Sequence, residues 1–111
     1  MYEGTTPTYY LTVIGEDITN MTVYVTMFGR PSAVKITWTN GDEGLEIESC
    51  EDGTLITLTL TQEQTLQLGV GDADVQVKWI DIDGVACATE VGRVHVHRSL
   101  LREVITHREG E

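Results

Sequence analysis

The chain has 111 residues, of which 41% are hydrophobic, and its 18 acidic and 7 basic residues give a formal net charge of −11. This length suffices for one domain with its own core, and the acidic balance argues against duplex DNA or an anionic membrane as a partner. No apolar run reaches the roughly 20 residues of a membrane helix, and the N-terminus lacks the features of a signal peptide, so export by that route is not expected.

The sequence is rich in β-branched residues, including sixteen threonines, and such residues suit a pleated strand. Residues 1–7 are expected to form an N-terminal arm. After it come segments in which apolar and polar residues alternate, as in half-buried strands, with turns between them about every ten residues. The segments are residues 9–13, 22–28, 34–38, 45–47, 56–60, 73–79, 85–90 and 91–96.

One polar segment, LTQEQTL at residues 60–66, interrupts this series. Thr61 can cap a helical turn by accepting an N–H bond, and Gln64 can reach back to the Thr61 backbone N–H, as in a capping box. These residues predict one short helical turn near 61–65, after which a strand resumes at Leu66. We interpret the segment as a crossing from one sheet of a sandwich to the other.

These patterns predict a single domain, residues 8–106, followed by a frayed tail at 107–111. Seven to nine strands without a long helix indicate an all-β fold, an immunoglobulin-like β-sandwich, with a small β-barrel as the alternative. The alternation places Trp38 and Trp79 on inward faces. Residues 99–105 are expected to close the fold as a short strand or a helical turn.

An acidic hairpin segment partly fits a calcium-binding loop. Its possible ligands fall at loop positions 3, 5 and 12, as Asp81, Asp83 and Glu90. Position 1 is Trp79, which cannot ligate, and the flanking segments are strands instead of helices. An Asp-x-Asp-Gly turn explains the same residues, so no calcium site is predicted.

Two histidines, His95 and His97, lie on one face of a predicted strand, where a pair of imidazoles can chelate zinc. A third ligand is not placed beside them, and a polar outer face is the simpler interpretation. Cys50 and Cys87 lack a CxxC partner and are expected to stay reduced, Cys87 as a small buried side chain. No phosphate loop or nucleophile elbow occurs, so we predict no cofactor, no catalytic residue and no enzymatic activity.

Four segments occur in an order that resembles a known group of proteins. They are GTTPT at residues 4–8, LTQEQTL at 60–66, VQVKW at 75–79 and LLREVI at 100–105. The chain resembles small immunoglobulin-like virion proteins encoded by phages and prophages of Gram-positive gut bacteria, similar to the N-terminal domain of siphophage baseplate upper proteins. The resemblance covers roughly residues 4–105.

The resemblance implies a non-enzymatic tail, baseplate or capsid-associated protein, made in the host cytoplasm and located in the virion. Its partners would be copies of itself or another virion protein, with no nucleic acid and no membrane. Tyr2, Tyr9 and Tyr10 are the candidate interface residues, because tyrosine offers a large contact area with a polar tip. Two alternatives stay open: a carbohydrate-binding module for host adhesion, and an acidic inhibitor that mimics nucleic acid to block a host protein.

Overall fold

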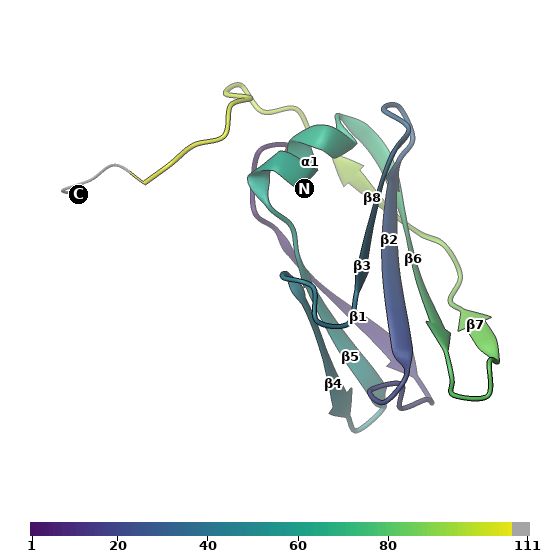
Figure 1. Ribbon diagram of the computed structural model, residues 1–111. Coiled ribbons are helices and arrows are strands. Elements are labelled where there is room, and N and C mark those ends of the chain that lie inside the picture. The colour runs from purple at the N-terminus through teal and green to yellow at the C-terminus, as the bar shows by residue number, and fades with distance from the viewer. Residues whose placement is uncertain (108–111) are drawn as a thin grey trace.

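A computed structural model describes residues 1–107, which form eight strands and one helix (Figure 1). In chain order these are β1 (Thr8–Ile14), β2 (Thr22–Gly29), β3 (Val34–Thr39), β4 (Leu45–Cys50), β5 (Gly53–Thr59), α1 (Gln62–Leu68), β6 (Gly71–Ile80), β7 (Ala86–Ala88) and β8 (Gly92–Val96). The predicted all-β fold is confirmed. None of the helical residues in this part of the chain forms a helix long and apolar enough to span a membrane.

The strands form two antiparallel sheets packed as a sandwich. One sheet has the order β1-β5-β4, and the other has the order β3-β2-β6, with β7 and β8 both paired to the far side of β6. Within residues 1–107 no strand of one sheet pairs with a strand of the other, so the sheets form an open sandwich and not the alternative barrel. Because β2 lies between β3 and β6, the strand order differs from that of constant-type immunoglobulin domains, in which the second strand lies beside the fifth.

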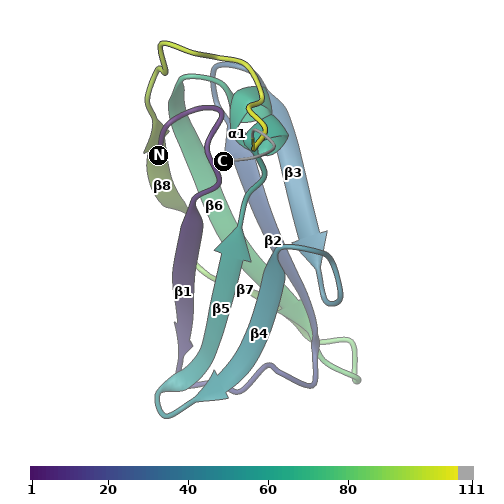
Figure 2. The same ribbon diagram turned by 90° about the vertical axis from the view of Figure 1, so that its left-hand side faces the viewer.

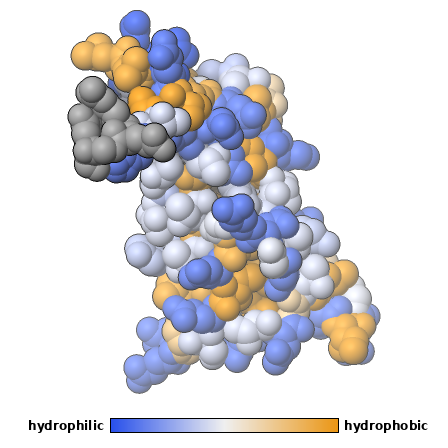
Figure 3. Space-filling model, turned by 60° about the vertical axis from the view of Figure 1, so that its left-hand side comes forward, coloured by the Kyte–Doolittle hydropathy of each residue, from blue (hydrophilic) through white to orange (hydrophobic). Residues whose placement is uncertain are grey.

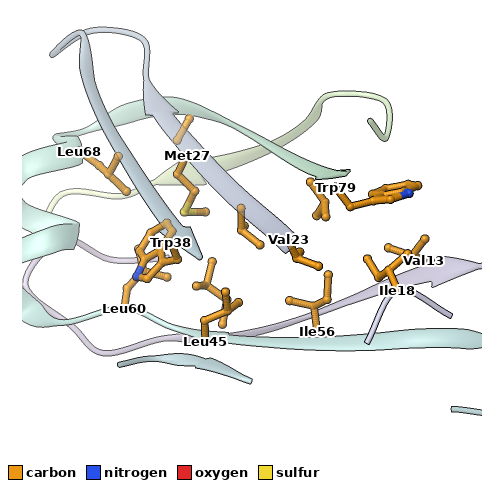
Figure 4. Close-up of a cluster of buried hydrophobic side chains, with 14 of the residues drawn as sticks. Val13, Ile18, Val23, Met27, Trp38, Leu45, Ile56, Leu60, Leu68 and Trp79 are labelled. Carbon is orange, nitrogen blue, oxygen red and sulfur yellow. The ribbon is translucent and has the colours of Figure 1, made fainter. Parts of the chain in front are cut away.

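The core lies between the two sheets, as the alternation predicted. Val23, Val25 and Met27 point inward from β2 and are buried, and so are Trp38 of β3 and Trp79 of β6. Figure 4 shows Val23, Met27 and Trp38 facing apolar residues of the opposite sheet, among them Leu45 and Ile56. Burial of one such side chain contributes roughly 1.5–3 kcal/mol, so this row of residues fixes which face of each strand is exposed.

Helix α1 makes the predicted crossing between the sheets. Thr61 Oγ1 accepts a hydrogen bond from the Gln64 N–H at 3.2 Å, and Gln64 Oε1 accepts one from the Thr61 N–H at 2.8 Å, so the capping box is confirmed. The helix continues to Leu68, and the prediction that a strand resumes at Leu66 was wrong. The helix continues because it buries apolar surface. Thr65 and Leu68, three residues apart on one helical face, are buried and close the end of the core.

The pairing along β6 shifts by one residue between β7 and β8. Trp79 pairs with Cys87, whereas Asp72 pairs with His95. Between β7 and β8, Thr89 Oγ1 accepts the Val77 N–H at 3.1 Å. The Thr89 side chain thus takes the place of a backbone carbonyl in the sheet. The two strands predicted at this place are therefore one edge of the sheet interrupted by a bulge.

The expected N-terminal arm, residues 1–7, lies beside the end of β8. Tyr2 forms an isolated parallel bridge with His97, the Glu3 N–H donates to the His97 carbonyl at 3.0 Å, and the His97 N–H donates to the Met1 carbonyl at 2.6 Å. These bonds cover part of the exposed edge of β8, which would otherwise present unpaired backbone groups.

The C-terminal segment, residues 99–105, runs over the end of the sandwich that carries α1 (Figure 2). It forms neither a strand nor a helix, so the prediction for this segment was wrong. Hydrogen bonds to the side chains of Glu3 and Gln62, described below, hold the segment instead of the backbone hydrogen bonds of a strand. Of the tail predicted at residues 107–111, all but residue 107 lies outside the described residues.

Candidate functional site

The three tyrosines predicted as interface residues point in different directions. Tyr2 is exposed, with its ring tilted against the His97 ring at a centroid distance of 5.2 Å. Tyr10 is exposed on the outer face of β1, opposite Thr57. Tyr9 points inward from β1 and is half-buried against the core, where burial raises the pKa of its hydroxyl. Only Tyr2 and Tyr10 therefore offer their rings to a partner.

The two histidines lie in a row of polar side chains on the outer face of β6 and β8. Their ring centroids are 4.7 Å apart, and His95 Nδ1 lies 3.0 Å from Asp72 Oδ1. This hydrogen bond, supported by the nearby Arg93 charge, holds the pKa of Asp72 below its usual range. No group of three or more His, Cys, Asp or Glu residues within 1–107 is placed to hold a metal ion.

The acidic segment between β6 and β7 is a turn. Asp81 Oδ1 accepts the backbone N–H groups of Asp83 and Val85, both at 2.9 Å, and Gly84 has a φ of 84°. A carboxylate that caps a turn in this way explains the Asp-x-Asp-Gly sequence. The interpretation as a turn is therefore confirmed.

Both cysteines are free thiols. Cys50 is half-buried at the end of β4, but Cys87 is exposed, so the prediction of a buried Cys87 was wrong. It is exposed because β7 is a short strand at the edge of its sheet. There Cys87 lines a surface hollow of about 370 Å³ together with Trp79 and Met21.

The C-terminal segment, residues 99–105, carries the most concentrated group of exposed apolar side chains. Leu100 and Leu101 are exposed, and so are Val104 and Ile105. Figure 3 shows hydrophobic side chains gathered at this end of the molecule. Single exposed apolar residues are ordinary on a protein surface, but four among six consecutive residues are typical of a surface that binds another molecule.

A buried carboxylate fixes the beginning of this segment. Glu3 is only 1% exposed, and its Oε1 accepts the Ser99 N–H at 3.2 Å and Arg102 Nε at 2.9 Å. The Ser99 hydroxyl also donates to the Glu3 carbonyl at 2.7 Å. The other carboxylate oxygen, Oε2, is buried and has no hydrogen-bond partner in the described part of the chain. Burying a carboxylate is unfavourable unless it is paired, so this contact ties the N-terminal arm to residues 99–102.

An amide side chain fixes the other end of the segment. Gln62, the first residue of α1, donates from Nε2 to the Ile105 carbonyl at 2.8 Å and accepts the Ile105 N–H on Oε1 at 2.7 Å. Val104 lines a neighbouring hollow of about 450 Å³ beside the start of α1. The segment is therefore held at both ends, and the leucines between the two anchors are left facing solvent.

The sequence did not identify this site. The motif LLREVI was expected to close the fold, and Glu3 was placed in the expected N-terminal arm at residues 1–7. The dense apolar pattern of residues 100–105, placed near a predicted tail, was the signal for it. Comparisons of the chain with protein-family models, with curated proteins and with solved structures find no match.

Proposed function

We propose that the protein is a non-enzymatic structural domain of a phage virion, which acts by protein–protein assembly and uses residues 99–105 as its main contact. The observation that carries this proposal is the exposed apolar row of that segment, held in place by Glu3 and Gln62. A contact of this kind needs an apolar surface and no catalytic group.

Anchoring at both ends favours binding for an entropic reason. A free C-terminal segment would lose backbone and side-chain freedom on docking, whereas this one is already ordered by four hydrogen bonds and one ion pair. Each leucine that a partner buries fully would contribute roughly 1.5–3 kcal/mol. The segment is thus prepared for a partner before the partner arrives.

The virion assignment is supported by the resemblance to immunoglobulin-like virion proteins, in which LLREVI is one of the shared segments. The partner would be another copy or a neighbouring tail, baseplate or capsid protein. The sandwich suits this role, because β1, β3 and β4 lie at sheet edges and assembly can cover such edges.

The two alternative functions have less support. A carbohydrate-binding surface commonly uses an aromatic platform, and both tryptophans, Trp38 and Trp79, are buried in the core. A nucleic-acid mimic needs a dense array of carboxylates, whereas many acidic residues of this chain lie in short clusters in separate turns. Neither alternative uses the apolar C-terminal segment.

The test is the number of copies that co-purify with phage particles, measured by quantitative mass spectrometry. The native chain is compared with the variant Leu100→Ser/Leu101→Ser/Val104→Ser, which keeps all the anchoring groups. The control is Ile82→Ser/Val85→Ser, which removes exposed apolar side chains from the β6–β7 turn.

We expect the native chain and the control to be found in particles and the triple variant to be depleted at least about tenfold, which corresponds to a loss of about 1.4 kcal/mol. Absence of the native chain from particles would refute the virion role. Equal incorporation of the triple variant would refute the role of the C-terminal segment.

A further inference from the structure

The outer face of the β3-β2-β6 sheet carries most of the positive charge of this acidic molecule. Tyr24 and Phe28 of β2 and Ile80 of β6 are exposed on it, with Phe28 near one end of the sheet and Ile80 at the opposite end. The face holds four of the seven basic residues of the chain, Arg30, Lys35, Lys78 and Arg93. We call it the cationic face.

Two carboxylates on the cationic face are already paired. Arg30 Nε lies 2.9 Å from Asp74 Oδ2, and Arg93 lies 3.6 Å from Asp74 and 3.9 Å from Asp72. Lys35 and Lys78 are exposed and form no ion pair with any residue in the described range 1–107. Four basic against two acidic residues leave the face positive, on a chain whose net charge is −11.

The outer face of the opposite sheet, β1-β5-β4, has the reverse character. Its exposed apolar side chains are Tyr10 and Ile14 of β1. Glu46 and Glu48 point outward from β4, and the three strands contain no basic residue. We call this the anionic face. The two faces lie on opposite sides of the sandwich, since each sheet buries its other side in the core.

We infer that the cationic face of one copy binds the anionic face of a second copy. Lys35 and Lys78 would pair with Glu46 and Glu48 of the neighbour, with the exposed side chains of Tyr24 and Ile80 beside Lys78. A hollow of about 380 Å³ lined by Tyr24, Lys78 and Ile80 offers space for an inserted side chain. Positive groups on one face would thus meet negative groups on the other, and complementary charge of this kind is common in protein interfaces.

The contact joins two different faces, so each copy in a pair keeps one face free for the next copy. Such a heterologous contact produces open stacks instead of closed dimers. Three strands of about seven residues cover roughly 330 Å² of face, from spacings of about 3.3 Å along and 4.8 Å between strands. This is the projected footprint of one small sheet face, which corresponds to the small interfaces of transient contacts, so the contact is weak and depends on concentration.

Salt affects this contact in two opposite ways. At low ionic strength the net charge of −11 on each copy repels other copies, because the Debye screening length is then long and charges far from the contact still interact. Near 0.1 M salt, screening over about 10 Å removes most of that repulsion but leaves pairs in direct contact. At about 1 M salt the contact pairs are screened as well. Association is therefore strongest at intermediate salt.

The inference rests on the proposed assembly role and adds its partner, a second copy. The experiment is sedimentation velocity of the full chain from micromolar to millimolar concentration. Three variants are compared with the native chain: Lys35→Glu/Lys78→Glu, Glu46→Lys/Glu48→Lys, and the quadruple variant with all four changes, which keeps the net charge of −11. A further control, Glu63→Lys/Asp83→Lys, alters the net charge as much as Glu46→Lys/Glu48→Lys but lies outside both faces.

We expect the native chain, the control and the quadruple variant to associate. Each of the two charge-reversal double variants should remain monomeric alone, because both of its faces then carry the same sign of charge. A mixture of the two should associate, because each contact then joins a positive face of one variant to a negative face of the other. Circular dichroism verifies folding, and the milder Lys35→Gln/Lys78→Gln variant should give an intermediate shift of at least about threefold in the association constant.

A native chain that stays monomeric near 0.1 M salt overturns the inference, and so does a quadruple variant that stays monomeric. Association that is lost only in Leu100→Ser/Leu101→Ser/Val104→Ser would place the contact between copies at the C-terminal segment and also overturn the stacking. Failure of the proposed virion role is a separate result, because incorporation into particles is measured independently of association in solution.

Discussion

The ion pair between Glu3 and Arg102 is asymmetric, and this asymmetry predicts the effect of removing each partner. The Glu3 side chain is fully buried, whereas that of Arg102 is 62% exposed. When Glu3 is replaced by Gln, Arg102 returns to water and the Gln amide oxygen can still accept the Ser99 N–H. When Arg102 is replaced by Ala, the carboxylate stays buried with the Ser99 backbone N–H as its remaining partner, and a buried charge without a counter-charge is far more costly.

The expected magnitudes follow from this difference. Glu3→Gln should weaken docking of residues 99–105 by about 1.4 kcal/mol, because one hydrogen bond to a charged group is lost. Arg102→Ala should weaken the docking of residues 99–105 by about 2.8 kcal/mol, near the lower end of the range of energies for breaking a buried ion pair. The double variant should resemble Glu3→Gln alone, since no charge is then left in the buried site.

Native-state hydrogen exchange at the Ser99 amide measures the docking directly. The exchange rate should rise roughly 10-fold in Glu3→Gln and roughly 100-fold in Arg102→Ala. The Ile18 amide, which is bonded to Thr54 Oγ1 in the core at 2.9 Å, should change little. Glu103→Ala, which removes an exposed carboxylate next to Arg102, is the matched control. Equal effects of the two single variants, or a double variant worse than Arg102→Ala, would contradict this reasoning.

Two other predictions concern the sandwich itself. Gly53→Ala should lower the free energy of unfolding by more than about 3 kcal/mol, because the new Cβ would lie 2.1 Å from the Val13 carbonyl oxygen at a backbone φ of 145°. The control is Gly41→Ala, whose new Cβ would have no atom within 4 Å and which should cost about 1 kcal/mol. Urea unfolding measures both values. The lowered pKa of Asp72 means that its contribution to stability is present above its unfolded value near 3.9 and is lost as the pH falls through the lower folded value. NMR titration should place the midpoint of Asp72 below about 3.9, and His95→Ala should raise it; a native midpoint at or above that value would contradict the assignment.

The strands and the crossing could be predicted because their signals are local. On β2, Val23, Val25 and Met27 alternate with polar residues, and this two-residue period alone determines which face is buried. The capping box at Thr61 and Gln64 also depends only on residues three positions apart. Local signals of this kind identify elements and faces, and they were sufficient for a β-sandwich.

The terminal site could not be predicted because its contacts join residues far apart in the chain. Ser99 and Arg102 reach Glu3 across almost the whole sequence, and Gln62 meets Ile105 from a helix. A glutamate in a polar N-terminal segment ordinarily faces water, so nothing in its neighbours indicates that it is buried. Its burial follows only from how the end of β8 brings the N-terminal arm beside residues 99–102.

Two departures from ordinary burial meet at this junction. A carboxylate lies inside with one oxygen lacking a partner, and leucines lie outside next to the groups that pair with it. Folding alone gives no reason for either, because Glu3 could be apolar and Leu100 polar without disturbing the core between the sheets. Sequences break local rules most often where a site serves function. The buried charge holds the segment by hydrogen bonds that leave its apolar side chains exposed, and the partner that we propose would supply the burial that the chain itself does not provide.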